Sequence, residues 1–287
     1  MPVVDRSVDF HVHAAPSFFP RSETDDSLLQ HAIEYGLGGL VLKAHEGSTA
    51  ERASLLNQRH GGRIHVFGSI TLNQFVGGWN AAAVDAAVAL GARVVWAPTL
   101  HAANHVQYYG GAMYREQPLA TPLREWPPVG LYDDSGAVAA NVHAVLEVIA
   151  FADVVLATGH LAPHESRDLV AAARNHGVRR IVLTHPDLPI TAISRDQQKA
   201  WARDDVFLEK SFLTTIDPWG SDTVDQLAQD IRDIGVDQVV LQTDLGQAQS
   251  VKPAEGWQEF LERLLEAGLS YTELNRVASD NAWALLT

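Results

Sequence analysis

Residues 153–185 read DVVLATGHLAPHESRDLVAAARNHGVRRIVLTH, and the fold can be worked out from this stretch. An apolar run ends in His160, a segment with helical spacing and a glycine follows, and a second apolar run ends in His185. Parallel strands that are covered on both faces read as nearly continuous apolar runs, and glycine commonly follows the last turn of a helix. The stretch therefore predicts one strand–helix–strand unit of a parallel sheet, with a histidine at the end of each strand.

The same unit recurs in both directions from this stretch. The predicted strands are residues 7–13, 39–45, 64–73, 93–99, 153–161, 180–185, 206–212 and 238–244. The predicted helices between them are residues 25–36, 50–61, 80–91, 141–152, 164–177, 221–235 and 256–268. Eight parallel strands are the number that closes a barrel. We therefore predict an α/β protein with a (β/α)₈ TIM-type barrel, formed by residues 1–287 as a single domain.

The rhythm is interrupted once, at about residues 100–140. A connection of this length without periodicity is usually a functional lid or a disordered insert. The aromatic residues of the segment favour an ordered lid, and they suggest that the lid covers a substrate with a planar or apolar part. These aromatic residues are Tyr108, Tyr109, Tyr114 and Trp126. Residues 129–138 are predicted to form a small hairpin that turns at residues 134–136.

Charge and composition exclude several classes of function. The chain has 21 Lys and Arg against 35 Asp and Glu, a formal net charge of −14, which argues against nucleic acid or an anionic membrane as a partner. Without cysteine there is no thiolate site or cysteine nucleophile, so any metal needs nitrogen and oxygen ligands. Residues 1–13 have no apolar signal-peptide core and no apolar run is long enough for a membrane span, so we expect a cytoplasmic protein.

Polar residues that can hold a metal ion gather at the ends of the predicted strands. His11 and His13 end the first strand, and residues i and i+2 of a strand point to the same face. His160, His185 and Asp244 end the fifth, sixth and eighth strands. Because active sites of parallel barrels lie at the carboxyl ends of the strands, these side chains are expected to form one site.

This arrangement resembles the amidohydrolase superfamily of metal-dependent TIM-barrel hydrolases. The resemblance covers the chain from the first strand to the closing segment YTELNRVASDNAWALLT, at residues 271–287. It implies that His11 and His13 bind a first metal ion and that Asp244 is a ligand and the general base. It further implies that His160 and His185 bind a second ion, or that one binds and the other polarises the substrate.

The sequence departs from the superfamily pattern in the fourth strand. That strand reads ARVVWAPTL, at residues 92–100, and lacks the Lys or Glu that many members have there. The simpler expectation is a mononuclear site of His11, His13, His160 and Asp244, with His185 behind it or on the substrate. We expect a divalent metal ion, Zn²⁺ as first choice with Mn²⁺ or Fe²⁺ as alternatives, in one or two copies.

Lys43 near the end of the second strand has three competing interpretations. It is carbamylated and bridges two metal ions, it faces a substrate carboxylate or a developing oxyanion, or it forms an ion pair with Glu46 or Glu209. We rank substrate or metal contact first. Of Glu209 and Lys210 in the seventh strand, only one is expected to point inward. Further candidates for substrate binding are His45, Asn73, His101, His105 and Arg21.

These observations predict an enzyme in which a metal-activated water cleaves a C–N or C–O bond of a small amide, cyclic amide or lactone. Asp244, His185 and Lys43 are the candidate catalytic residues. The alternatives are a phosphoesterase of the polymerase-and-histidinol-phosphatase type, a decarboxylase on the same barrel, and a barrel that binds a ligand without catalysis. The expected partner is a small-molecule substrate, and association into a homo-oligomer is compatible with this fold.

Overall fold

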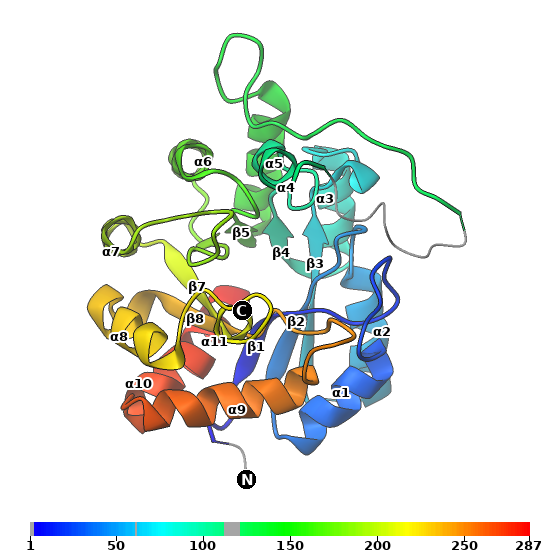
Figure 1. The fold of residues 1–287 in the computed structure, drawn as a ribbon. Coiled ribbons are helices and arrows are strands. Elements are labelled where there is room, and N and C mark those ends of the chain that lie inside the picture. Colours follow the sequence, from blue (N-terminus) through cyan, green and yellow to red (C-terminus); the bar gives the residue numbers. More distant parts are fainter. Residues whose placement is uncertain (1–2, 61, 112–120) are drawn as a thin grey trace.

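The computed structural model describes residues 3–60, 62–111 and 121–287. Eight strands form one sheet in which each pairs in parallel with the next in the chain (Figure 1), which confirms the predicted (β/α)₈ barrel. The strands are β1 (Val8–Val12), β2 (Gly39–Leu42), β3 (His65–Thr71), β4 (Ala92–Trp96), β5 (Val155–Ala157), β6 (Ile181–Leu183), β7 (Phe207–Ser211) and β8 (Val239–Gln242). All eight fall inside or within one residue of the predicted ranges, and they are shorter because the chain turns out of the sheet at the barrel mouth.

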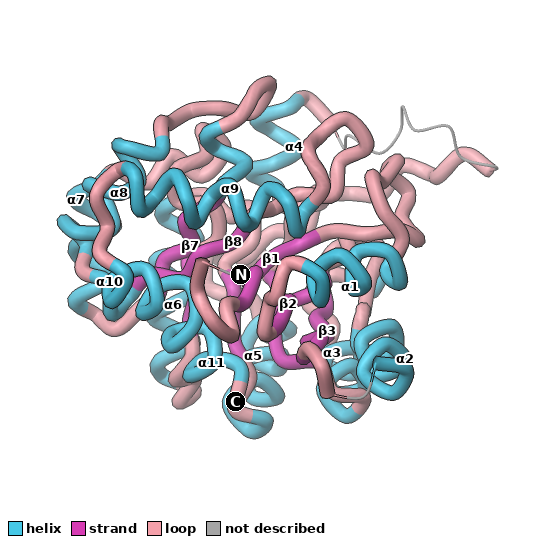
Figure 2. Tube along the Cα trace, turned by 90° about the horizontal axis from the view of Figure 1, so that it is seen from below, coloured by secondary structure: helices cyan, strands magenta, loops and turns pink. Residues whose placement is uncertain are grey.

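Helices alternate with the strands and surround them, as Figure 2 shows. The helices are α1 (Asp25–Glu34), α2 (Ala50–His60), α3 (Ala81–Ala89), α4 (Ala103–Tyr109), α5 (Ala140–Ala152), α6 (Pro163–Asn175), α7 (Arg195–Arg203), α8 (Val224–Ile234), α9 (Pro253–Glu266), α10 (Tyr271–Asn275) and α11 (Asn281–Leu286). The sequence prediction omitted α7, whose sequence RDQQKAWAR has too few apolar residues to show a helical stripe. No helix among the described residues has the length and hydropathy of a membrane span.

Bulky side chains fill the interior of the barrel. Phe10 of β1, Trp96 of β4 and Val182 of β6 belong to one buried cluster, although their strands are not neighbours in the sheet. Side chains from such strands can meet only inside a closed barrel. Leu285 of α11 joins the same cluster, and its carbonyl accepts a hydrogen bond from Arg180, just before β6. Helix α11 therefore closes the amino-terminal end of the barrel and leaves the carboxyl end for the site.

Side-chain hydrogen bonds join β8 to β1. The carboxylate of Asp9 accepts from the amide and the hydroxyl of Thr243, at 2.9 and 2.6 Å, and from the amide of His11 at 3.2 Å. Beyond this link, the amide of Asp244 donates to the carbonyl of His11 at 2.9 Å. This seam between β8 and β1 brings His11 and His13 next to Asp244, across the longest sequence separation in the barrel.

The segment after β4 contains helix α4 and an anchored return. The amide of Val129 donates to the carbonyl of His101, and an antiparallel bridge between Tyr132 and Val138 forms the predicted hairpin. Residues 112–120, with the predicted lid residue Tyr114, lie outside the described residues. Trp126 is exposed, whereas Tyr109 of α4 lines the cavity at the barrel mouth. A lid role for residues 100–140 stays a prediction.

Candidate metal centre

Sharp backbone turns at the strand ends aim the site residues. His185, after β6, and Asp244, after β8, have φ angles of 49° and 54°, in the left-handed region that non-glycine residues rarely adopt. Gly159 after β5 has a φ of 59°, and a Cβ there would lie 2.4 Å from the carbonyl oxygen of Ala97. Glycine is therefore required before His160. Each turn ends its strand early and directs the next polar side chain to the mouth of the barrel.

Three buried atoms define the centre of the site. His11 Nε2 and His13 Nε2 are 3.3 Å apart, and Asp244 Oδ1 lies 3.1 Å from the first and 3.0 Å from the second. Ligand atoms at about 2.0–2.1 Å from a tetrahedral ion are separated by roughly 3.3 Å. The three atoms therefore have the spacing of three ligands of one tetrahedral ion, which would leave a fourth position open.

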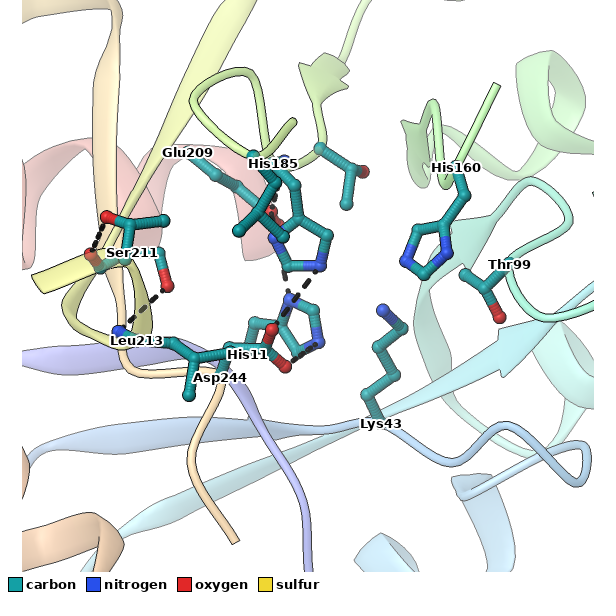
Figure 3. Close-up of polar contacts among 12 residues, drawn as sticks. His11, Lys43, Thr99, His160, His185, Glu209, Ser211, Leu213 and Asp244 are labelled. Atoms are coloured by element: carbon teal, nitrogen blue, oxygen red, sulfur yellow. Dashed lines mark hydrogen bonds and ion pairs between the residues drawn. The ribbon is translucent and has the colours of Figure 1, made fainter. Parts of the chain in front are cut away.

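Two further residues complete this cluster (Figure 3). His185 Nε2 lies 3.5 Å from Asp244 Oδ2, the carboxylate oxygen that faces away from the H-x-H pair. Glu209 Oε2 lies 3.7 Å from His11 Nδ1 and 3.8 Å from His185 Nδ1. His11, His185 and Glu209 form a second group whose ligand atoms lie within 4.8 Å of one another. Glu209 either holds a second ion with these histidines or orients both rings from behind.

The outer nitrogens determine which atoms of the histidines face the centre. His13 Nδ1 lies 3.0 Å from the carbonyl oxygen of Lys43, so it donates its proton there and keeps the Nε2 lone pair free. A carboxylate behind His11 and His185 favours the same tautomer in both rings. Such outer partners are a common feature of histidine ligands in metal sites.

Electrostatics favour a cation at this position. Burial and the nearby Arg21 lower the pKa of His13 well below its usual value, and burial lowers the pKa of His185 to about 4, so both rings are neutral at pH 7. Burial and Lys43 lower the pKa of His11, but Asp244 and Glu209 outweigh them and raise it. Burial raises the pKa of Asp244, but His11 and His185 hold it well below its ordinary value. The carboxylates of Asp244 and Glu209 thus favour positive charge at this position, which a metal ion would supply.

The donor set fits a divalent metal ion. It consists of imidazole nitrogens and carboxylate oxygens, which suit Zn²⁺, Mn²⁺ and Fe²⁺. His11 Nδ1, His185 Nδ1 and Glu209 Oε1 are buried and have no hydrogen-bond partner among the described residues. Unpaired buried polar atoms are costly, and charge from a bound ion would draw all three into tighter contacts.

The opposite side of the mouth is built from different residues. Lys43 is 1% exposed, and its ammonium lies 4.6 Å from the centre of the Trp96 ring without a hydrogen-bond partner among the described residues. Burial lowers its pKa to about 8. His160 Nδ1 lies 2.8 Å from His105 Nδ1, and the His45 ring stacks on His13. Burial lowers the pKa of His45 and His160 well below their usual values, with neighbouring cations and imidazoles adding to the effect.

A cavity of about 350 Å³ lies between the two sides. Its lining includes His13, Phe19, Arg21, Lys43, His45, His105, Tyr109, His160, His185, Trp219 and Asp244. This volume is at the lower end of the range for small-molecule sites, which is about 300–1,000 Å³. The cavity therefore suits a small substrate placed between the cluster around Asp244 and the Lys43 side.

The structure separates the sequence-predicted residues into three sets. His11, His13, His185 and Asp244 lie together at the mouth of the barrel. His160, His45, His105, Arg21 and Lys43 line the cavity but belong to neither ligand group among the described residues, so a metal-ligand role for His160 stays a prediction. Asn73 donates to the His45 carbonyl and to Thr99 and accepts from the amides of Thr99 and His101. With its amide occupied, Asn73 positions these loops, and His101 packs edge-on against Phe75.

The sequence prediction did not assign Glu209 or Asp9 to their places in this site. Strand alternation left Glu209 and Lys210 equivalent, and the structure turns Glu209 to the site and Lys210 outward to an ion pair with Asp187 at 2.9 Å. The predicted ion-pair partners of Lys43, Glu46 and Glu209, are not within ion-pair distance of it among the described residues. The register of β1 shifts between Asp9 and Val12, so strand alternation in D-x-H-x-H at residues 9–13 gave no signal for the position of Asp9.

Comparisons with known proteins agree with this architecture. A family model described as "Family of unknown function (DUF6282)" matches residues 6–209. An amidohydrolase from Pseudomonas aeruginosa has a similar structure, with a TM-score of 0.65 and 12% identity over 98% of this chain and 95% of that one. An amidohydrolase from Burkholderia multivorans gives a TM-score of 0.58 at 15% identity, over 98% of each chain.

A dipeptidase described as a metallopeptidase of family M19 also has this fold. Its TM-score is 0.57 at 12% identity, over 98% of each chain. No curated protein sequence matches the chain. At these identities the structural likeness establishes a shared barrel fold.

Proposed function

We propose that this chain, which belongs to the family of unknown function DUF6282, is a metal-dependent hydrolase that cleaves a C–N or C–O bond of a small amide, cyclic amide or lactone. One observation carries the proposal. His11 Nε2, His13 Nε2 and Asp244 Oδ1 lie 3.0–3.3 Å from one another at the floor of a cavity, with the spacing of three ligands of a tetrahedral ion. Three protein ligands and an open position are typical of catalytic metal sites. The amidohydrolase and dipeptidase neighbours support the same reaction class.

The metal ion would be held by His11, His13 and Asp244, with His185 next to them. When bound, a divalent ion acts as a Lewis acid and lowers the pKa of a coordinated water from about 15.7 to roughly 7. Glu209, behind His11 and His185, keeps these rings in the tautomer whose Nε2 faces the centre.

Asp244 is placed to carry the proton. Its Oδ1 belongs to the ligand triangle, whereas its Oδ2 faces His185 at 3.5 Å and remains available as a base. We assign to it the transfer of a proton from the attacking water to the leaving group. Its low pKa keeps it ionised before the reaction, as a general base requires.

Lys43 is the residue best placed to oppose negative charge that develops on the substrate. Its ammonium is buried, lines the cavity and makes no hydrogen bond within the described residues. A fixed, desolvated cation that faces a developing oxyanion stabilises it far more than water does. This role follows one of the three sequence interpretations of Lys43, and the absence of an ion pair weighs against the structural one.

The phosphoesterase alternative receives less support. It requires further carboxylates in the site, for which Glu46 and Glu209 are the candidates in the sequence. The carboxylate of Glu46 accepts hydrogen bonds from Ser17 Oγ and the amide of Phe18. It therefore serves the loop after β1, and Glu209 alone does not complete the larger ligand set.

The proposal is tested by hydrolysis of a panel of N-acyl amino acids, cyclic amides and lactones, with protein reconstituted with Zn²⁺ or Mn²⁺. We expect metal-dependent turnover, and a loss of about 10²-fold or more in kcat for Asp244→Asn, which removes the proton acceptor. Near-full activity of Asp244→Asn with its metal retained would remove the general-base role. A wild type that takes up no metal would overturn the hydrolase itself.

A further inference from the structure

The charges around the cavity are unbalanced. Arg21 and Lys43 line it, and Asp244 is the only carboxylate among the described lining residues. That carboxylate is already engaged by His11 and His13. The space left for a substrate therefore carries excess positive charge, which a bound divalent ion would increase.

Arg21 has the hydrogen-bond donors that could bind an anionic group in this space. It lies in the loop between β1 and α1, held in place by a bridge with Gln247 in the loop after β8. Its guanidinium lies 5.5 Å from the centre of the Phe19 ring, and its Nη2 is 3.4 Å from His13 Nδ1. Its Nε is buried without a hydrogen-bond partner, and Arg21 makes no ion pair among the described residues. The carboxylate of Glu46 favours the charged form of Arg21. It accepts its hydrogen bonds from Ser17 and Phe18, however, and not from Arg21.

We propose that the substrate carries a carboxylate and that the guanidinium of Arg21 binds it. This inference rests on the proposed function and specifies its substrate class. The planar fork of an arginine matches the two oxygens of a carboxylate. A single arginine in a cavity of about 350 Å³ suits this group better than a phosphate, which usually takes several donors.

The position of Arg21 also limits the distance between the carboxylate and the bond that is cleaved. Its contact with His13 Nδ1 places the guanidinium beside one of the proposed metal ligands. The carboxylate and the scissile carbonyl must therefore be separated by only a few bonds, as in an N-acylated amino acid or a cyclic amide with a carboxylate next to the ring. Phe19, Tyr109 and Trp219 supply apolar walls for the rest of the molecule.

The test compares two probes of nearly the same shape, the anion benzoate and the neutral benzamide, by calorimetric titration of metal-loaded protein. We expect benzoate to bind at least about tenfold more tightly than benzamide. Arg21→Gln should weaken benzoate roughly 10- to 100-fold, as the loss of a charge-assisted pair predicts, and leave benzamide unchanged. Arg21→Lys should recover part of the loss, because it restores the charge without the fork. Arg167→Gln, at a side chain that is 70% exposed, is the matched control.

Two outcomes would overturn the inference. One is equal binding of the two probes to the wild type. The other is a preference for benzoate that persists in Arg21→Gln, since a carboxylate that binds the metal ion directly would not depend on Arg21.

Failure of the proposed function is recognised separately. Arg21-dependent binding of benzoate by a protein without hydrolytic turnover would retain the carboxylate site and remove the hydrolase. Turnover that prefers neutral amides over their acidic counterparts would retain the hydrolase and remove the carboxylate site.

Discussion

The two sides of the barrel mouth use histidine in different electrostatic surroundings. On the side of β1, β6, β7 and β8, His11, His13 and His185 lie within 4 Å of the carboxylates of Asp244 or Glu209. On the side of β2, α4 and β5, the described structure shows no ion pair for His45, His105 or His160, and the neighbouring positive charges are those of Lys43 and Arg21.

This difference supports a different binding role for each side. Imidazole nitrogens that converge on carboxylates form a site for a cation, because the carboxylates offset the charge that burial would otherwise make costly. On the other side, the described imidazoles have no carboxylate within ion-pair distance, and the positive charges of Lys43 and Arg21 beside them favour an anion. We therefore expect the metal ion on the first side of the mouth and an anionic group of the substrate on the second.

The largest effect is expected on the side of β1, β6, β7 and β8, where the histidines face carboxylates. His11→Ala combined with His13→Ala should abolish metal binding, because it removes two of the three converging ligand atoms. His160→Ala, on the other side, should retain metal near the wild-type stoichiometry. Elemental mass spectrometry of protein purified without chelator measures both. Loss of metal in His160→Ala would instead restore this residue to the ligand set predicted from the sequence.

His143→Ala combined with His176→Ala is the matched control for that experiment. These two histidines contact each other at 2.9 Å on the outside of the barrel, so the double variant removes the same groups without touching the mouth. It should keep its metal.

A smaller effect is expected at Glu209, which acts on the ligands from behind. Glu209→Gln keeps the shape of the side chain but removes the charge that faces His11 Nδ1 and His185 Nδ1. Loss of such an outer partner typically weakens metal binding by roughly 10- to 100-fold. Competition with a chelator of known affinity measures the change. Complete loss of metal would make Glu209 a direct ligand, and no change would remove it from the centre.

The smallest effect concerns Lys43 and the stability of the metal-free protein. Its pKa of about 8 in the fold is below the ordinary value of 10.5, so the fold binds this proton less tightly than the unfolded chain does. The cost to stability is present in full below pH 8 and is relieved as pH rises from 8 to 10.5. Lys43→Met should therefore raise the free energy of unfolding at pH 7 by about 1–2 kcal/mol, after allowance for the lost contact with Trp96.

Urea unfolding of both proteins at pH 7 and pH 10.5 checks this prediction. The difference between Lys43→Met and the wild type should shrink at the higher pH, where Lys43 is neutral in the fold and the cost of burying its charge has been relieved. Lys43→Gln, which keeps a polar end without charge, separates the effect of charge from that of hydrogen bonding. A Lys43→Met variant that is less stable than the wild type at pH 7 would show that the ammonium is well accommodated.

The sequence alone predicted the barrel because the relevant signals are local. Most strand–helix units show an apolar run, a helical stripe and a glycine, as at residues 153–185, and eight apolar runs in this rhythm are compatible with few other architectures. The polar residues that end the runs were predictable for the same reason, since all strands of a parallel barrel end at one face. Helix α7 was missed because its buried positions, Gln198 and Ala202, carry a polar and a small side chain, so RDQQKAWAR has few apolar residues.

The tertiary structure decided how those residues divide between two tasks. Only the seam between β8 and β1, linked through Asp9 and Thr243, sets His11 and His13 against Asp244. The orientation of Glu209 rather than Lys210 toward the site depends on strand register, which a continuous polar pair in the sequence does not reveal. The sequence thus determined which chemical groups reach the mouth of the barrel. Distances between strands far apart in the chain determined which of them meet, and charge and burial at each position follow from those distances.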